Sequence, residues 1–362
     1  MRLDQTVHDA DVIVCCGPGG VGKTTTAAVI GLHAARRGRR VVVVTIDPAR
    51  RLADALGLTS GLTGEPQQVE RGRTGDGELW AMMLDTPAMF ERVVRANATD
   101  QEQADRIVQN RFYRNISSAL SGTQEYMASE ALHELHGDDR FDLVVVDTPP
   151  SRNALDFLEA PGVLTRFLDH KVFKLMMLPT RTGLKVFSIA TQPVLKAIGR
   201  VVGSDVLIDA VAFFQAFAGM DVGFRDRAEA VTQLLRADST RFLIVAAPQR
   251  EVIDECAWFA DQLTEQGFEV SATVVNRLHP RFGDGTVTDA EQRATAADER
   301  GDHDLAAIWS NLATERRLAE VQRAALAPLV ARTVDALVEV PLLPDDVHDV
   351  EALDVLATHL FA

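Results

Sequence analysis

The chain has 362 residues, of which 46% are hydrophobic and 25% charged, the composition of a globular protein large enough for one α/β domain with insertions or for two domains. Its formal net charge of −15 argues against a surface that coats nucleic acid, which needs a concentrated basic field. The first short apolar run follows acidic residues, and no apolar stretch reaches the roughly 18 to 20 residues of a spanning helix. We therefore expect a cytoplasmic protein without a signal peptide.

Short runs rich in Val, Ile and Leu recur along the chain, at 12–17, 40–47, 78–85, 141–148, 241–248, 269–278 and 337–343. Continuous apolar runs of this length indicate strands buried on both faces, as in a parallel sheet. The intervening segments are mostly long enough for crossover helices, and residues 23–38 form one that Gly38 closes. This alternation predicts an α/β fold with a doubly wound, mostly parallel sheet and ligands at the carboxyl ends of its strands.

Two stretches do not fit simple alternation: residues 86–138 have helical periodicity, and residues 151–238 are much longer than a single crossover helix requires. We predict that they are helical insertions forming a subdomain within one domain that spans 1–362. The second stretch contains the apolar segments "FKLMMLP" and "AVAFFQAFAGM". Residues 280–304 are polar and punctuated by glycine, which predicts a mobile loop.

The strongest signal is "CCGPGGVGKTTTAA", residues 15–28, which lies between a predicted strand and a predicted helix. Gly17, Gly22, Lys23 and Thr24 satisfy G-x-x-x-x-G-K-[ST], the pattern of a loop whose backbone N–H groups surround phosphates. Lys23 is expected to reach the β- and γ-phosphates, and Thr24 to place its hydroxyl on Mg²⁺. The predicted nucleotide contacts here are Gly19, Gly20, Val21, Gly22, Lys23, Thr24 and Thr25.

Two aspartates follow predicted strands on either side of this loop. Asp47 ends the run at 40–47, where it holds water or a metal, or else caps a helix that begins near Pro48. Taken alone, the helix cap is the better interpretation of Asp47. Asp147 follows four apolar residues in a Walker-B-like pattern, which predicts a carboxylate that supports Mg²⁺.

The chain resembles the ArsA family of ATPases, which includes the ATPase of the arsenite pump and the targeting factor for tail-anchored membrane proteins. The resemblance spans essentially the whole sequence and rests on ordered segments, "GPGGVGKTTTA", "DPARRLADALG", "DTPPSRNALDFL", "VVNRLHP" and "VPLLPDDV". It implies a dimeric, nucleotide-switched ATPase that uses ATP and Mg²⁺. By the same resemblance Asp47 orients the attacking water and Asp147 lies near Mg²⁺, while Asn276 binds adenine with Pro341 and Leu343 beside the purine.

Departures from the family pattern are informative. Family members carry a lysine that crosses the dimer interface at the position of Pro18, and proline has no such group to offer. The charge of that lysine is supplied instead by Arg50, Arg51 or Arg152, or by a partner subunit in a homodimer or a heterodimer with a paralogue. If neither supplies it, hydrolysis is slow. No C-x-x-C follows "VVNRLHP", so we expect no dimer zinc. Cys15 and Cys16 lie in a predicted strand as small hydrophobes, so arsenite transport is not expected.

Two functions are consistent with an ATPase of this kind. In the first, the helical insertions bind a hydrophobic protein client, as in a chaperone or targeting factor, although apolar helices are as often core. In the second, a regulatory ATPase of the partition or cell-division type assembles on membrane or DNA. The acidic composition argues against nucleic acid, and the C-terminal "DVLATHLFA" lacks a basic amphipathic face, while peripheral membrane contact stays open. A small-molecule kinase or synthetase would need a substrate pocket that the sequence does not reveal.

Overall fold

The computed structural model describes residues 3–47, 49–71, 77–111, 122–170 and 204–362. Eight strands of the described chain form one sheet in the order β3-β4-β2-β5-β1-β6-β7-β8. Neighbouring strands are parallel except for β3, which runs antiparallel to β4 at one edge. The strands are β1 Val12–Cys16, β2 Arg40–Thr45, β3 Gln67–Arg71, β4 Glu78–Met83, β5 Leu143–Asp147, β6 Thr240–Ala246, β7 Val270–Leu278 and β8 Ala336–Pro341.

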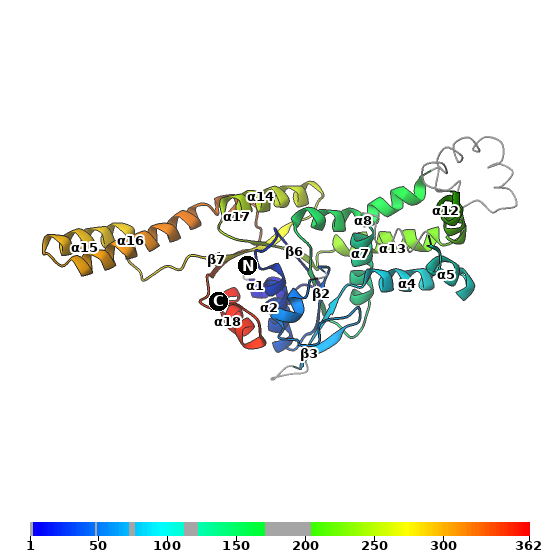
Figure 1. Cartoon of the computed structure of the whole chain (residues 1–362), viewed down its shortest axis with the longest axis horizontal. Coiled ribbons are helices and arrows are strands. Elements are labelled where there is room, and N and C mark those ends of the chain that lie inside the picture. Colours follow the sequence, from blue (N-terminus) through cyan, green and yellow to red (C-terminus); the bar gives the residue numbers. More distant parts are fainter. Residues whose placement is uncertain (1–2, 48, 72–76, 112–121, 171–203) are drawn as a thin grey trace.

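Helices cover both faces of this sheet (Figure 1). One apolar core packs α1, α2, α3 and α18 against one face, and a second packs α4, α5, α7, α8, α13 and α14 against the other. The predicted doubly wound, mostly parallel α/β fold is confirmed. The described helices are α1 Leu3–His8, α2 Lys23–Arg36, α3 Arg51–Ala55, α4 Thr86–Asn97, α5 Gln101–Val108, α7 Thr123–His136, α8 Ser151–Asp169, α12 Ser204–Ala216, α13 Asp221–Leu235, α14 Arg250–Glu265, α15 Val287–Glu299, α16 His303–Ala324, α17 Ala327–Val330 and α18 Val350–Leu360.

Strand β1 lies near the centre of the sheet, between β5 and β6, and its five apolar residues are all fully buried there. Each predicted apolar run overlaps one of the observed strands, and β6 and β8 begin one residue before their runs. The sequence pattern missed β3, whose residues "QQVER" offer a single apolar side chain. An edge strand pairs on one side only, so it can form without the apolar run that identifies a buried strand.

Helices α4, α5 and α7 lie within residues 86–138, and α8, α12 and α13 lie within 151–238. They lie side by side at the end of the molecule opposite the α15–α16 pair (Figure 1). An aromatic cluster packs them together: the ring of Phe217, in the turn after α12, lies 5.0 Å from Phe213 and 5.4 Å from Phe224 between centroids. Part of "AVAFFQAFAGM" therefore belongs to the core. The segment "FKLMMLP" lies outside the described residues.

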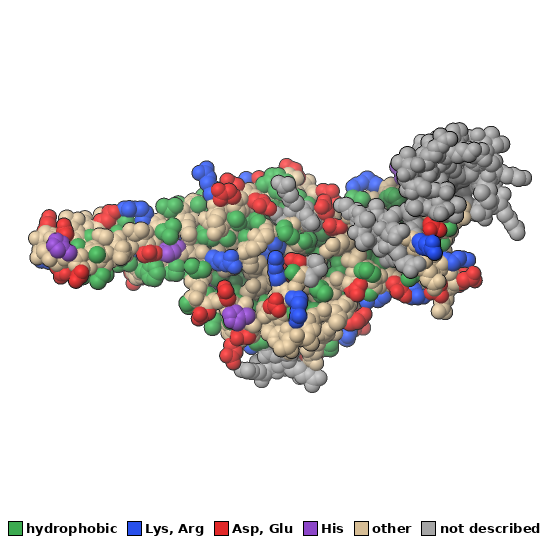
Figure 2. All heavy atoms as spheres, in the orientation of Figure 1, with side chains coloured by type: hydrophobic (Ala, Val, Ile, Leu, Met, Phe, Trp, Pro, Cys, Tyr) green, Lys and Arg blue, Asp and Glu red, His purple; other side chains and the backbone are tan. Residues whose placement is uncertain are grey.

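The prediction of a mobile loop at 280–304 is wrong over most of its length. Helix α15 occupies 287–299 and packs along α16, and together they form a hairpin that projects from the sheet (Figure 1). Thr286 and Asp289 start α15 with a reciprocal capping box. Small side chains, among them Ala290 and Ala313, are buried in this part of the chain. The side chains of α15 are mostly exposed and polar, and charged groups are scattered over the visible hairpin surface (Figure 2), so the sequence of α15 resembles that of a solvated loop.

This correction is testable at Thr286. The Thr286→Ala variant removes the hydroxyl that accepts from the Asp289 N–H, a loss that costs about 1 kcal/mol at a helix N-cap. We expect amide hydrogen exchange across 287–299 to accelerate accordingly, with ATP turnover unchanged. Thr288→Ala, two residues further along and exposed within the helix, is the control and should leave exchange in α15 unaffected. Exchange of the unchanged protein at free-peptide rates over 287–299 would contradict the helix.

Candidate functional site

The phosphate loop connects the end of β1 to the start of α2, and two of its glycines are needed for close approaches. Gly17 has a φ of +145°, and a Cβ there would collide with the backbone oxygen of Val245 in β6. Gly22 has a φ of +99°, and a Cβ there would collide with the side-chain amide of Asn276. Helix α2 begins with neither a side-chain cap nor an acidic residue in its first turn. Its first N–H groups and its positive end are therefore available to an anion.

Lys23 is the buried cation of this loop, with 8% of its surface exposed. Its ammonium group donates a 2.8 Å hydrogen bond to the carbonyl of Pro18. Burial lowers the pKa of Lys23, while the neighbouring carboxylate of Asp147 raises it. Pro18, itself buried, therefore contributes a carbonyl that holds the loop's own lysine and no charge of its own.

Asp147 ends β5 and joins three segments through one carboxylate oxygen. Its Oδ2 accepts from the hydroxyl of Thr24 at 2.8 Å and from the hydroxyl of Thr45 at 2.9 Å. Thr45 stands directly opposite Asp147 in the β2–β5 register, which places the two side chains together. Oδ1 of Asp147 is buried and has no hydrogen-bond partner among the described residues. Burial raises the pKa of this carboxyl, because its charged form is poorly solvated. Leaving one oxygen without a partner costs free energy, and a bound cation would offset that cost.

Asp47 lies just beyond β2 and turns back on its own segment. Its carboxylate accepts a 2.9 Å hydrogen bond from the N–H of Ala49, and its Oδ2 is 3.5 Å from the guanidinium of Arg51. Pro48 lies outside the described residues. The helix that follows begins at Arg51 with Arg50 as its N-cap residue, so the alternative that Asp47 caps a helix near Pro48 is wrong.

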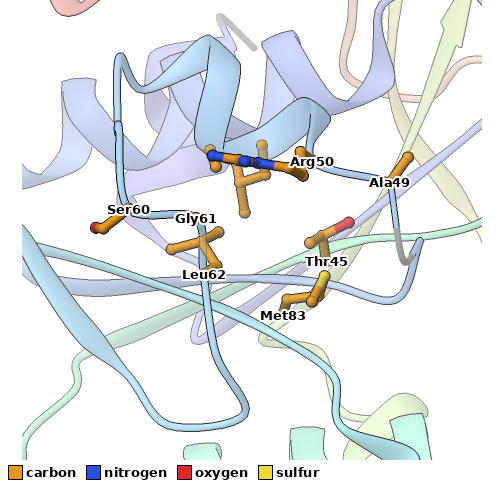
Figure 3. Close-up of a pocket in the computed structure, with 9 residues that line it drawn as sticks. Thr45, Ala49, Arg50, Ser60, Gly61, Leu62 and Met83 are labelled. Carbon is orange, nitrogen blue, oxygen red and sulfur yellow. The ribbon is translucent and has the colours of Figure 1, made fainter.

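The candidate arginines point in different directions. Arg50 extends across a cavity of about 240 Å³ toward Ser60 and Gly61 (Figure 3) and donates to the carbonyl of Thr59 at 3.2 Å. Arg51 stays beside Asp47 with 64% of its side chain exposed. Arg152 belongs to the first turn of α8, and its side chain lies outside the described part of the structure.

Two consecutive residues of β7 clamp the phosphate loop by its carbonyls. The side-chain amide of Asn276 donates to the carbonyl of Val21, and the guanidinium of Arg277 donates to the carbonyl of Gly20, both at 3.0 Å. Carbonyls that are bound on the outside leave the loop N–H groups free to face inward. Arg277 adopts a left-handed φ of 61°, which is uncommon for a residue other than glycine and occurs where surrounding structure enforces it.

Beside this clamp lies a cavity of about 200 Å³. Gly22 and Thr25 line it from the loop side, Asn276 from β7, and Pro341 and Leu343 from the end of β8 and beyond. The three residues expected around adenine thus come together next to the phosphate loop. Sequence reasoning missed Arg277 and Thr45. The sequence marks Arg277 only as the neighbour of Asn276, and it marks Thr45 only as the last residue of an apolar strand.

The described fold agrees with comparison to known proteins. A family model described as an anion-transporting ATPase, of the ArsA type, matches residues 10–298. The chain belongs to the ArsA ATPase family. It is 30% identical over 311 residues to an uncharacterized protein of Streptomyces coelicolor, covering 82% of this chain and 70% of that protein. It is also similar to an ATPase GET3 of Malassezia globosa, with 26% identity over 266 residues that cover 74% of this chain and 72% of the fungal protein.

A further relative of this ArsA-family chain is an arsenical pump-driving ATPase of Acidiphilium multivorum, 26% identical over 287 residues. The match covers 78% of the present chain and only 40% of the pump ATPase. These relatives establish the chain as an ATPase.

The three cysteines of this ArsA-family ATPase are free, buried thiols. Burial raises the pKa of Cys16 and of Cys256 to about 12, so both are inert as nucleophiles or metal ligands. Within the described ranges no group of three or more His, Cys, Asp or Glu side chains is placed to hold a metal ion. In the same ranges no helix is both long and apolar enough to cross a membrane.

The loop geometry makes Gly22 a sensitive position. Gly22→Ala would force a left-handed alanine, a strain of about 1–3 kcal/mol, and would displace Asn276 from Val21. We expect a lower thermal unfolding midpoint and weaker binding of a fluorescent ATP analogue. Gly162→Ala, within α8, meets only an ordinary contact and is the control that should lower neither. Full nucleotide affinity in Gly22→Ala would contradict the clamp on the loop.

Proposed function

We propose that this ArsA-family chain is a dimeric, nucleotide-switched ATPase that hydrolyses ATP at the phosphate loop and binds a hydrophobic protein client on its helical insertions. The observation that carries the catalytic half of the proposal is the buried carboxylate of Asp147. One of its oxygens is shared by Thr24 and Thr45, and the other is buried without a described partner. This is the arrangement expected where a cation accompanies the phosphates of a nucleotide.

The residues fit Mg²⁺, because a hydroxyl and a carboxylate oxygen are the ligand types that this hard cation prefers. Thr24 and Asp147 would hold the ion, which when bound neutralises charge on the phosphates. Loop N–H groups from Gly19 to Thr25 bind phosphate oxygens, and Lys23 adds the charge that the β- and γ-phosphates share. Asp47 orients the attacking water.

The purine occupies the cavity beside Asn276. Pro341 and Leu343 supply half-buried apolar surface on one side, and the Asn276 amide supplies polar groups. One amide N–H already holds Val21, and the second, with a lone pair of the carbonyl oxygen, remains to bind a base edge. Adenine recognition and the hold on the phosphate loop thus share one side chain.

The client half of the proposal is supported by apolar residues exposed on the helical insertions. Val163 and Phe167 on α8 are each 47% exposed, and Val222 on α13 is 61% exposed. Large apolar side chains that stay in water favour a binding surface for another apolar chain. The protein acts in the cytoplasm, as a homodimer or as a heterodimer with a paralogue.

Loss of the loop lysine tests ATP binding. Lys23→Ala should weaken Mg²⁺-ATP binding by roughly 10- to 100-fold, because a charge-assisted contact contributes about 1.5–3 kcal/mol. Isothermal titration calorimetry measures the affinity, and a normal unfolding midpoint shows that the variant is folded. Unchanged affinity would mean that the loop does not bind the phosphates.

Removal of the water-orienting carboxylate tests hydrolysis. Asp47→Asn should bind ATP normally and turn it over about 10²-fold more slowly, since it affects the reacting water and not the ground state. The same variant, held with ATP, should retain a hydrophobic client in a pull-down that the ADP form releases. Turnover within a factor of a few of the unchanged protein would remove Asp47 from the mechanism.

A further inference from the structure

Phosphoryl transfer builds negative charge that a single buried lysine neutralises only in part, and a second cation near the γ-phosphate accelerates such reactions strongly. In this chain the loop position next to Gly17 is a proline, whose carbonyl faces Lys23. A second positive charge at this site would therefore come from outside the loop. Three arginines with described side chains are candidates, and their contacts differ.

Two of these arginines are directed elsewhere. Arg50 runs across its cavity toward Ser60 and Gly61 and donates to the carbonyl of Thr59 (Figure 3). Arg277 donates to the carbonyl of Gly20 in the phosphate loop. Both guanidiniums are thus engaged by backbone carbonyls, and that of Arg277 holds the phosphate loop itself.

Arg51 differs from both. Its guanidinium is 3.5 Å from Asp47, longer than the 2.7–2.9 Å of a tight charge-assisted hydrogen bond, and its side chain is 64% exposed. An exposed pair of this kind contributes little free energy and is easily exchanged for a better anion. The N–H of Ile46, which precedes Asp47, donates to the carbonyl of Asp147 at 3.1 Å, so the Asp47–Arg51 pair lies beside the residue whose carboxylate accepts from Thr24.

We propose that Arg51 is a catalytic arginine supplied by the chain itself, which leaves Asp47 for the transferring γ-phosphoryl group as hydrolysis proceeds. The exchange does two things at once. It brings a planar, always-charged donor to the transferring phosphoryl group, and it frees the Asp47 carboxylate from its counter-charge to accept from water. No new covalent step is involved, because water attacks phosphorus and ADP leaves as in ordinary hydrolysis.

This inference rests on the proposed function, and its test uses the full chain with Mg²⁺-ATP. Arg51→Ala should lower kcat on the order of 10³-fold, the lower range for an arginine of this role, with ATP affinity changed by less than a few-fold. Arg51→Lys should recover part of the rate, because it restores charge without the planar fork. Arg50→Ala is the matched control and should turn over ATP like the unchanged protein.

A second readout separates catalysis from a structural role of the Asp47–Arg51 pair. Arg51→Ala should lose affinity for ADP with aluminium fluoride, which mimics the transferring phosphoryl group, and keep its affinity for ADP alone. Equal affinities of Arg51→Ala and unchanged protein for the mimic, or equal losses of turnover in Arg50→Ala and Arg51→Ala, would overturn the proposal.

Mixing variants tests whether Arg51 acts within its own chain. Lys23→Ala cannot bind ATP well but carries an intact Arg51, whereas Arg51→Ala binds ATP and lacks the arginine. If Arg51 acts within one chain, the mixture should turn over ATP no faster than its parts. Restored turnover would overturn the proposal by assigning Arg51 to a partner's site. If the wild-type protein neither binds nor hydrolyses ATP, the proposed function is overturned instead.

Discussion

The site depends on a carboxylate that folding has buried at the centre of the sheet. Asp147 is 1% exposed, and among the described residues two hydroxyl groups, those of Thr24 and Thr45, satisfy one of its oxygens. Burying this group is costly unless its remaining oxygen is also satisfied. The same hydrogen bonds tie the first turn of α2 to β2 and β5, so the position of the phosphate loop depends on this one side chain.

Around that carboxylate, the shape of the loop is enforced from outside. Asn276 and Arg277 hold the carbonyls of Val21 and Gly20, and the segment after them continues into the base of the α15–α16 hairpin. There the N–H of His279 donates to Gln322 at 2.7 Å, and Arg323 donates to the carbonyl of His279 at 3.0 Å. The projecting hairpin is therefore anchored next to the residues expected to contact adenine.

The sequence predicts what burial dictates. Apolar runs identify the parallel strands, and the glycine spacing identifies the loop, because both patterns follow from sterics and exclusion of water. It fails where solvent-exposed structure is stabilised by pairing: β3 has one neighbour and α15 packs on α16 with a polar outer surface. Arg277 is hidden for another reason. Its role comes from a left-handed backbone and a contact 257 residues away in sequence, which no local pattern encodes.

The central claim is that the free oxygen of Asp147 serves a cation that accompanies the nucleotide. Calorimetric titration of ATP into the unchanged protein and into Asp147→Asn, with Mg²⁺ and then with EDTA, tests it most directly. The amide replaces the carboxylate at nearly constant shape and removes its charge. The account predicts that Mg²⁺ tightens binding to the unchanged protein only, while the two proteins bind ATP alike in EDTA. Equal tightening by Mg²⁺ in the Asp147→Asn variant would contradict it.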